Sequence, residues 1–95
     1  EIMESRGEFD EAISILAPYR GQSIQVDYKL GLLYEKASMK ALSHASFARY
    51  FFQTGKYKAS VHHLDQALKL EKELDPVIVK ELKEIKKLIK DAGLS

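Results

Sequence analysis

The side chains with the widest chemical range in this chain are its three histidines, His44, His62 and His63. An imidazole can transfer protons near neutral pH or bind a transition metal. His62 and His63 are sequence neighbours, so on a helix they point about 100° apart and cannot share a metal as an i, i+4 pair could. The zinc-protease pattern H-E-x-x-H does not occur. We therefore expect structural or surface roles for all three histidines and no metal site.

Other catalytic groups are equally sparse. Ser43 and His44 are adjacent, but no third member of a triad accompanies them. The five glycines are scattered and form no phosphate-binding loop. The absence of cysteine excludes disulfides and thiolate metal sites, and it leaves the redox compartment open. The sequence therefore predicts no catalysis by this chain and no cofactor, against the rival that it is an autonomous enzyme.

The length and the net charge of the chain limit the classes of partner that can be expected. A chain of 95 residues makes one small domain, which buries somewhat over half of its unfolded surface. A net charge of +1 gives no overall attraction to nucleic acid, so no nucleic-acid partner is expected. No segment approaches the roughly 18 apolar residues of a membrane span, so membrane contact is not expected either.

Residues 41–70 organise the predicted fold. They form two amphipathic helices joined at Thr54-Gly55-Lys56, and small side chains at positions 48, 60 and 67 alternate with large ones. The apolar positions of the two helices are Phe47, Ala48, Phe51, Tyr57, Val61, Leu64, Ala67 and Leu68. Small residues at these places allow the two helices to approach closely.

The segment before this hairpin predicts two further helices. Residues 7–12 repeat the hinge sequence of residues 55–60 position for position, which predicts a hinge at Gly7 and places residues 1–6 at the end of an earlier helix. Pro18 ends the following helix near Ala17, and residues 19–23 form a loop. The next helix should end near Ala37, with Ser38-Met39 as its turn.

The end of the chain predicts a final amphipathic helix. The preceding helix should extend to about Leu74, and Asp75-Pro76 then combines a capping side chain with a first-turn proline. Gly93 marks the end of the helix. Its apolar stripe is Ile78, Leu82, Ile85 and Ile89, and lysines 80, 83, 86, 87 and 90 occupy the polar face. Such a helix can shield the end of a helical stack, or alternatively lie on an anionic membrane.

These residues resemble the tetratricopeptide repeat (TPR), a pattern of 34 residues. Leu-Gly-x-x-Tyr stands at residues 30–34, and the later matches are His44, Phe47, Ala48, Phe51, Gly55, Tyr57, Ser60, Leu64 and Ala67. The resemblance implies an all-α fold, a TPR-like antiparallel helical solenoid of five to six helices with a C-terminal capping helix. Residues 1–23 would be a partial first repeat, 24–54 the middle repeat, 41–74 the last repeat, which shares a helix, and 75–95 the capping helix.

The repeat frame is irregular. Gly7 and Gly55 are 55 − 7 = 48 residues apart, which is one period plus 14 residues, or roughly one extra helix. The helix at residues 40–52 must therefore belong to both the middle and the last repeat. It can be sandwiched between neighbours, or it can leave one side free for a partner or for oligomer formation, as can the open ends of the solenoid.

A narrower resemblance covers residues 7–70. Gly-Glu-Phe-Asp-Glu-Ala, Tyr-Lys-Leu-Gly-Leu-Leu-Tyr-Glu-Lys and Ser-His-Ala-Ser-Phe-Ala-Arg-Tyr-Phe are similar to the C-terminal repeat region of bacterial cell-envelope zinc metallopeptidases. In that family the zinc ligands lie in an upstream domain, and nothing here matches them. The resemblance implies a substrate-docking or regulatory region of a periplasmic protease; without it, a cytoplasmic location is expected. The first residue is Glu1 rather than Met, and we expect a piece of a larger protein.

The repeat resemblance implies a non-catalytic protein–protein interaction module that binds peptide or protein segments in a groove. The expected partner-binding residues are Tyr28, Leu32, Glu35, Arg49, Phe52 and Gln53. Aromatic residues beside an arginine are typical of binding hot spots, although Phe52 could instead belong to the core. The carboxylate clamp of chaperone-adaptor TPR proteins is not expected, because the corresponding positions are Tyr28, Leu32, Leu42 and Ser46. Gly31 and Ala67 are predicted as helix-packing sites.

Overall fold

The computed structural model describes residues 2–94, and all regular structure in that range is helical. The five helices are α1 (Ile2–Leu16), α2 (Ile24–Lys36), α3 (Lys40–Gln53), α4 (Tyr57–Lys69) and α5 (Pro76–Asp91), with 3₁₀ turns at Ala17–Tyr19 and Glu71–Glu73. The predicted all-α class is confirmed. No helix in the described range is long and apolar enough to cross a membrane.

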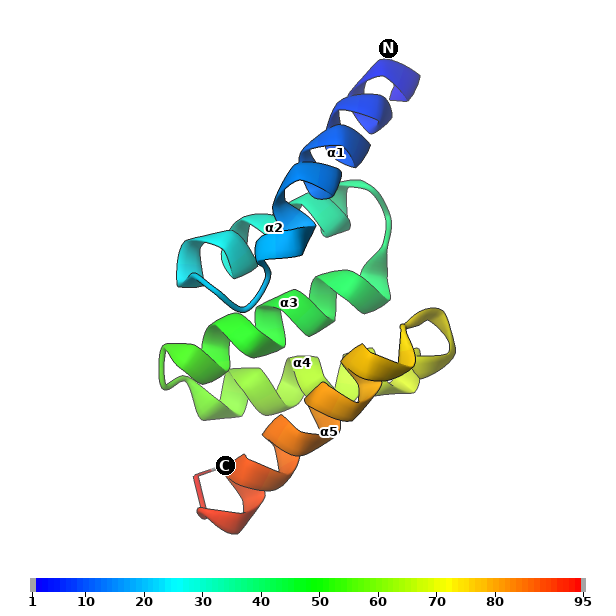
Figure 1. Cartoon of the computed structure of the whole chain (residues 1–95). Coiled ribbons are helices and arrows are strands. Elements are labelled where there is room, and N and C mark those ends of the chain that lie inside the picture. Colours follow the sequence, from blue (N-terminus) through cyan, green and yellow to red (C-terminus); the bar gives the residue numbers. More distant parts are fainter. Residues whose placement is uncertain (1, 95) are drawn as a thin grey trace.

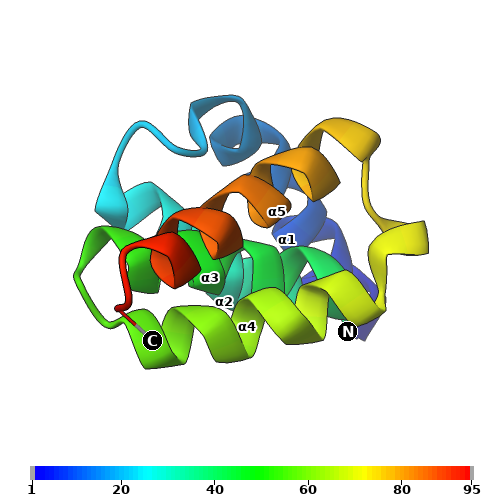
Figure 2. The ribbon, with the colours of Figure 1, turned by 90° about the horizontal axis from the view of Figure 1, so that it is seen from below.

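The helices α2, α3 and α4 form an antiparallel layer in chain order, with α1 against α2 at one edge (Figure 1). The last helix, α5, packs on α3 and α4 and crosses one face of this layer (Figure 2). The middle helix α3 therefore contacts α2, α4 and α5. Within the layer α3 is thus sandwiched between α2 and α4, while α5 covers only one of the two faces of the layer (Figure 2).

The core lies where α5 covers the layer. Small residues of α3 and α4 form its floor, which lets the branched side chains of α5 approach closely. The buried members are Ala41, Ala45, Ala48, Leu64, Ala67, Leu74, Ile78, Leu82, Ile85 and Ile89. The apolar stripe predicted for the last helix is thus buried. The predicted cap is confirmed as well, since the Asp75 side chain accepts a hydrogen bond from the Val77 N–H at 2.9 Å.

A unit of 17 residues recurs within the layer. The Ser43 hydroxyl donates to the carbonyl of Gly31 at 2.9 Å, and the Ser60 hydroxyl donates to the carbonyl of Ala48 at 2.8 Å. Both members of the second pair lie 17 residues after those of the first (48 − 31 = 60 − 43 = 17). The left-handed turn residues Ser38 (φ 62°) and Gly55 (φ 81°) have the same spacing. Each unit is therefore one helix plus one turn.

Two predicted boundaries are wrong. Gly7 lies inside α1 and forms no hinge, because a single glycine costs a helix interior only about 1 kcal/mol and can be retained there. The helix α4 ends at Lys69 and does not reach Leu74. Leu74 is extended and buried in the core, and this turn in the chain is what brings α5 back across the layer.

Gly31 marks a close approach of α2 and α3. A Cβ atom at this position would lie 2.8 Å from the ring of Phe47, closer than real Cβ contacts allow. We expect Gly31→Leu to destabilise the fold by about 1–3 kcal/mol in urea unfolding, because the ring and the helix must move apart. The matched control is Gly7→Leu, where a Cβ meets nothing within 4 Å and the better helix former should be neutral or stabilising. Equal stability of the two variants would show that the Phe47 ring can move away from Gly31 without a loss of folding stability.

Candidate functional site

The predicted partner-binding residues do not lie on one surface. Arg49 and Phe52 are on the side of α3 that faces α5, where Arg49 is bound to Glu81 and Phe52 packs against the core. The ring of Phe52 contacts Tyr57, with centroids 6.0 Å apart. Tyr28 is 44% exposed and contacts a different set of rings. The expected combination of Tyr28 and Phe52 beside Arg49 is therefore not assembled.

The other three predicted residues are also dispersed. Leu32 is half-buried in α2, and Gln53 is exposed at the last position of α3. Glu35 is exposed near the end of α2, where it lines a groove described below. Of the six residues, three are thus exposed on the α2–α3–α4 layer: Tyr28, Glu35 and Gln53.

Arg49 instead joins three helices through a cluster of charges. Its guanidinium donates to both carboxylate oxygens of Glu81 on α5, with Nη1 to Oε2 at 2.8 Å and Nη2 to Oε1. Its Nε lies 3.7 Å from the carboxylate of Asp27 on α2, which is 1% exposed and also accepts from the Gly21 N–H at 2.9 Å. Burial raises the pKa of Asp27, whereas the hydrogen bond from Arg49 lowers the pKa of Glu81. This cluster is a structural connection between α2, α3 and α5.

A row of rings crosses the layer on the side away from this cluster. Tyr28 on α2 lies with its ring centroid 5.0 Å from Tyr50 and 5.9 Å from Phe47, both on α3. The row continues to His63 on α4, whose ring is 5.5 Å from Phe47 and stacks on Phe51 at 5.4 Å. We call this set the aromatic row; its members are Tyr28, Phe47, Tyr50, Phe51, His44 and His63.

The aromatic row is not part of the core under α5. Phe47 and Phe51 each lie two residues from Arg49 and therefore point nearly opposite to it on the helix, and Phe52 points about 100° away from Phe51. Phe52 packs against the core, whereas none of the phenylalanine or tyrosine rings of the row does so. The row therefore presents half-buried aromatic surface on the face of the layer that α5 leaves uncovered.

A groove of about 560 Å³ adjoins the histidine end of the row. Its walls come from α2, α3 and α4, and they combine the two histidines with both signs of charge. The lining residues are Glu35, Ser38, Lys40, Ser43, His44, Phe47, His63, Gln66, Lys69 and Leu70. The groove can thus offer aromatic surface, hydrogen bonds and ionic contacts to one ligand.

His44 and His63 are in direct contact in this groove. Their Nδ1 atoms lie 2.9 Å apart, so one ring donates a proton and the other accepts it. Burial, followed by the charges of the other histidines, lowers the pKa of His63 to about 4, and burial also lowers the pKa of His44. The ring of His63 is therefore neutral at pH 7. Sequence reasoning missed this pair because it considered only the neighbours His62 and His63; the spacing 63 − 44 = 19, close to the 17-residue unit, was the available signal.

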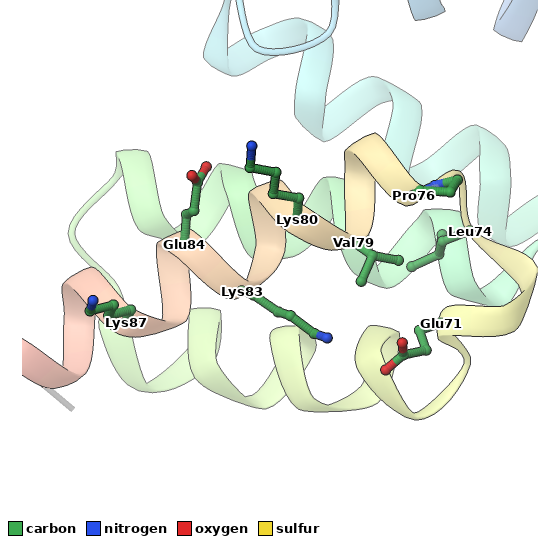
Figure 3. A pocket seen from close by; sticks show the side chains of 8 residues that line it. All are labelled: Glu71, Leu74, Pro76, Val79, Lys80, Lys83, Glu84 and Lys87. Atoms are coloured by element: carbon green, nitrogen blue, oxygen red, sulfur yellow. The ribbon is translucent and has the colours of Figure 1, made fainter.

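A second groove, of about 520 Å³, lies along α5 (Figure 3). Val79, Pro76 and Leu74 provide apolar surface between charged residues, with Lys80, Lys83 and Lys87 at the rim. Glu84 is spaced three or four residues from Lys80 and Lys87, which is the usual arrangement of a solvated helix surface. This groove has neither the ring contacts nor the buried polar groups of the first one.

In the described part of the chain, no group of three or more histidine, aspartate or glutamate side chains is arranged to hold a metal. The best-formed candidate site is thus the aromatic row with its groove. No family model, no curated protein and no solved structure matches the chain.

Proposed function

We propose that this chain is a non-catalytic protein-interaction module in which a segment of a partner protein binds along the aromatic row and into the adjoining groove. The observation that carries the proposal is the position of the row, on the face of the α2–α3–α4 layer that α5 does not cover. The expected occupant is a peptide or helix with apolar anchor side chains.

The composition of the row supports this function. Tyrosine and phenylalanine are enriched in the centres of protein interfaces, where a few large side chains supply most of the binding energy. All members of the row lie on helices, so a partner has little backbone to order on binding. Lys40, Lys69 and Glu35 at the groove supply the polar rim that such interfaces have.

The 17-residue unit supports a TPR-type architecture within the same proposal. It is half of the 34-residue repeat period, so two successive units make one repeat. In this interpretation α3 is the second helix of one repeat and the first helix of the next, as the irregular frame of the sequence requires. Repeats of this type commonly present a surface to peptides or helices of other proteins.

The proposal is tested by selecting peptides from a random phage-displayed library on the 95-residue chain. Selected peptides should bind Tyr28→Ala/Tyr50→Ala at least tenfold more weakly, which corresponds to about 1.4 kcal/mol. The matched control is Val77→Ala/Leu88→Ala, which truncates two exposed apolar residues of α5 and should leave the affinity unchanged. Thermal melts establish that each double variant is folded before its affinity is compared.

The opposite pattern would overturn the proposal. If the selected peptides bind the tyrosine variant as tightly as the parent, the aromatic row is not the binding surface. If they are lost in the α5 variant instead, the exposed surface of α5 around Val77 and Leu88 is the site. A selection that yields no saturable peptide argues against a peptide-binding module.

A further inference from the structure

Two metal-capable side chains, His44 of α3 and His63 of α4, meet at the wall of the groove. Their Nδ1 atoms are 2.9 Å apart, the ring centroids 5.1 Å apart, and the ring planes 36° from parallel. One Nδ1 donates its proton to the lone pair of the other. When that proton moves to Nε2 of its own ring, both Nδ1 lone pairs face the same small region of space.

The separation of these atoms is close to that in a metal site. Two imidazole nitrogens bound at 2.0–2.1 Å to a tetrahedral ion lie about 3.4 Å apart. To admit an ion, the two nitrogens would have to separate by about 0.5 Å, and both rings would have to turn so that their lone pairs converge on it. Both side chains are half-buried in a groove that is open to solvent, so an ion can reach them.

We propose that His44 and His63 bind one Zn²⁺ or Cu²⁺ ion through their Nδ1 atoms, with water in the remaining positions. Imidazole is a good ligand for both ions, and Cu²⁺ should bind more tightly than Zn²⁺. The site has two protein ligands and is completed by water, and no third protein ligand joins them in residues 2–94. The proposal stands on the geometry of the two rings and is independent of the proposed protein-binding function.

His62 provides the matched control. It is adjacent to His63 in sequence but exposed, and its ring lies at 75° to that of His63 with centroids 5.2 Å apart. The direct ring-nitrogen contact joins His63 to His44. Replacing His62 thus removes an imidazole from the same region while preserving the pair.

The experiment is isothermal titration of the untagged 95-residue chain with ZnCl₂ and CuCl₂ in a non-chelating buffer. One equivalent should bind, and His44→Gln or His63→Gln should weaken binding at least tenfold. His62→Gln should change the affinity less than twofold. Binding without a one-to-one stoichiometry, or an equal loss in the His62 variant, would overturn the assignment.

A second measurement uses the unsubstituted chain, so that a misfolded variant leaves the test intact. Zinc should shift the ¹⁵N resonances of Nδ1 in His44 and His63 and should leave those of His62 in place. No change at these two nitrogens on addition of zinc would exclude the site, whatever the behaviour of the variants.

Discussion

Removing residues 75–95 is expected to abolish cooperative unfolding and to leave a chain that associates in solution. The helix α5 buries Ile78, Leu82, Ile85 and Ile89, and burial of such a side chain contributes about 1.5–3 kcal/mol. Four of them together contribute about as much as the whole stability of a small domain. The truncation also exposes the alanine-lined floor of the core on α3 and α4. Thermal melts and sedimentation velocity measure both effects.

Single substitutions in α5 distinguish the contribution of its buried face to stability from that of its exposed face. Leu82→Ala, at a fully buried position, should cost about 2–5 kcal/mol. Leu88→Ala, at a position 58% exposed, should have little effect on the melting temperature.

For the truncation of residues 75–95, the contradicting outcome is a chain that remains monomeric and melts like the parent. That result would show that α5 does not contribute to the core of the fold.

Arg49→Ala is expected to destabilise the fold by about 3–5 kcal/mol, which is typical of breaking a buried ion pair. The Arg49 side chain is 12% exposed, and its loss leaves the buried carboxylate of Asp27 without its cation. Arg49→Lys should recover only part of the loss, because an ammonium cannot donate to both oxygens of Glu81 as the guanidinium does. Urea unfolding measures both variants.

The exposed ion pair between Lys86 and Asp65 is the control for Arg49. Its side chains are 46% and 44% exposed, and the nitrogen and oxygen lie 2.7 Å apart. Lys86→Ala should therefore cost less than about 1 kcal/mol. A similarly small cost for Arg49→Ala would contradict the structural role of Arg49 and would favour its predicted role in binding a partner.

The elements with strong local signals were predictable from the sequence. Asp75-Pro76 begins α5 as expected, and the hinge at Gly55 lies between α3 and α4. These signals depend on residues within one turn of each boundary. Gly7 shows the limit of this reasoning, because the same six-residue pattern ends a helix at Gly55 but lies within one at Gly7.

The candidate site was less predictable, because it depends on contacts between distant residues. Both faces of α3 carry large side chains, and the face left uncovered depends on where α5 docks. Arg49 was predicted to meet a partner, yet it pairs with Glu81, which lies 32 residues further along the chain. The pairing of His44 with His63 likewise requires α3 and α4 to pack in one register.

The 17-residue unit also determines the direction in which the chain leaves the layer. Successive units are antiparallel, so the three helices α2, α3 and α4 carry the chain from one end of the layer to the other (Figure 1). From that far end α5 runs back across α3 and α4 to close the core. Inserting a single unit would reverse the exit and leave α5 on the wrong side, whereas inserting two would restore it. The parity of the helix count is therefore expected to constrain how this fold can lengthen or shorten.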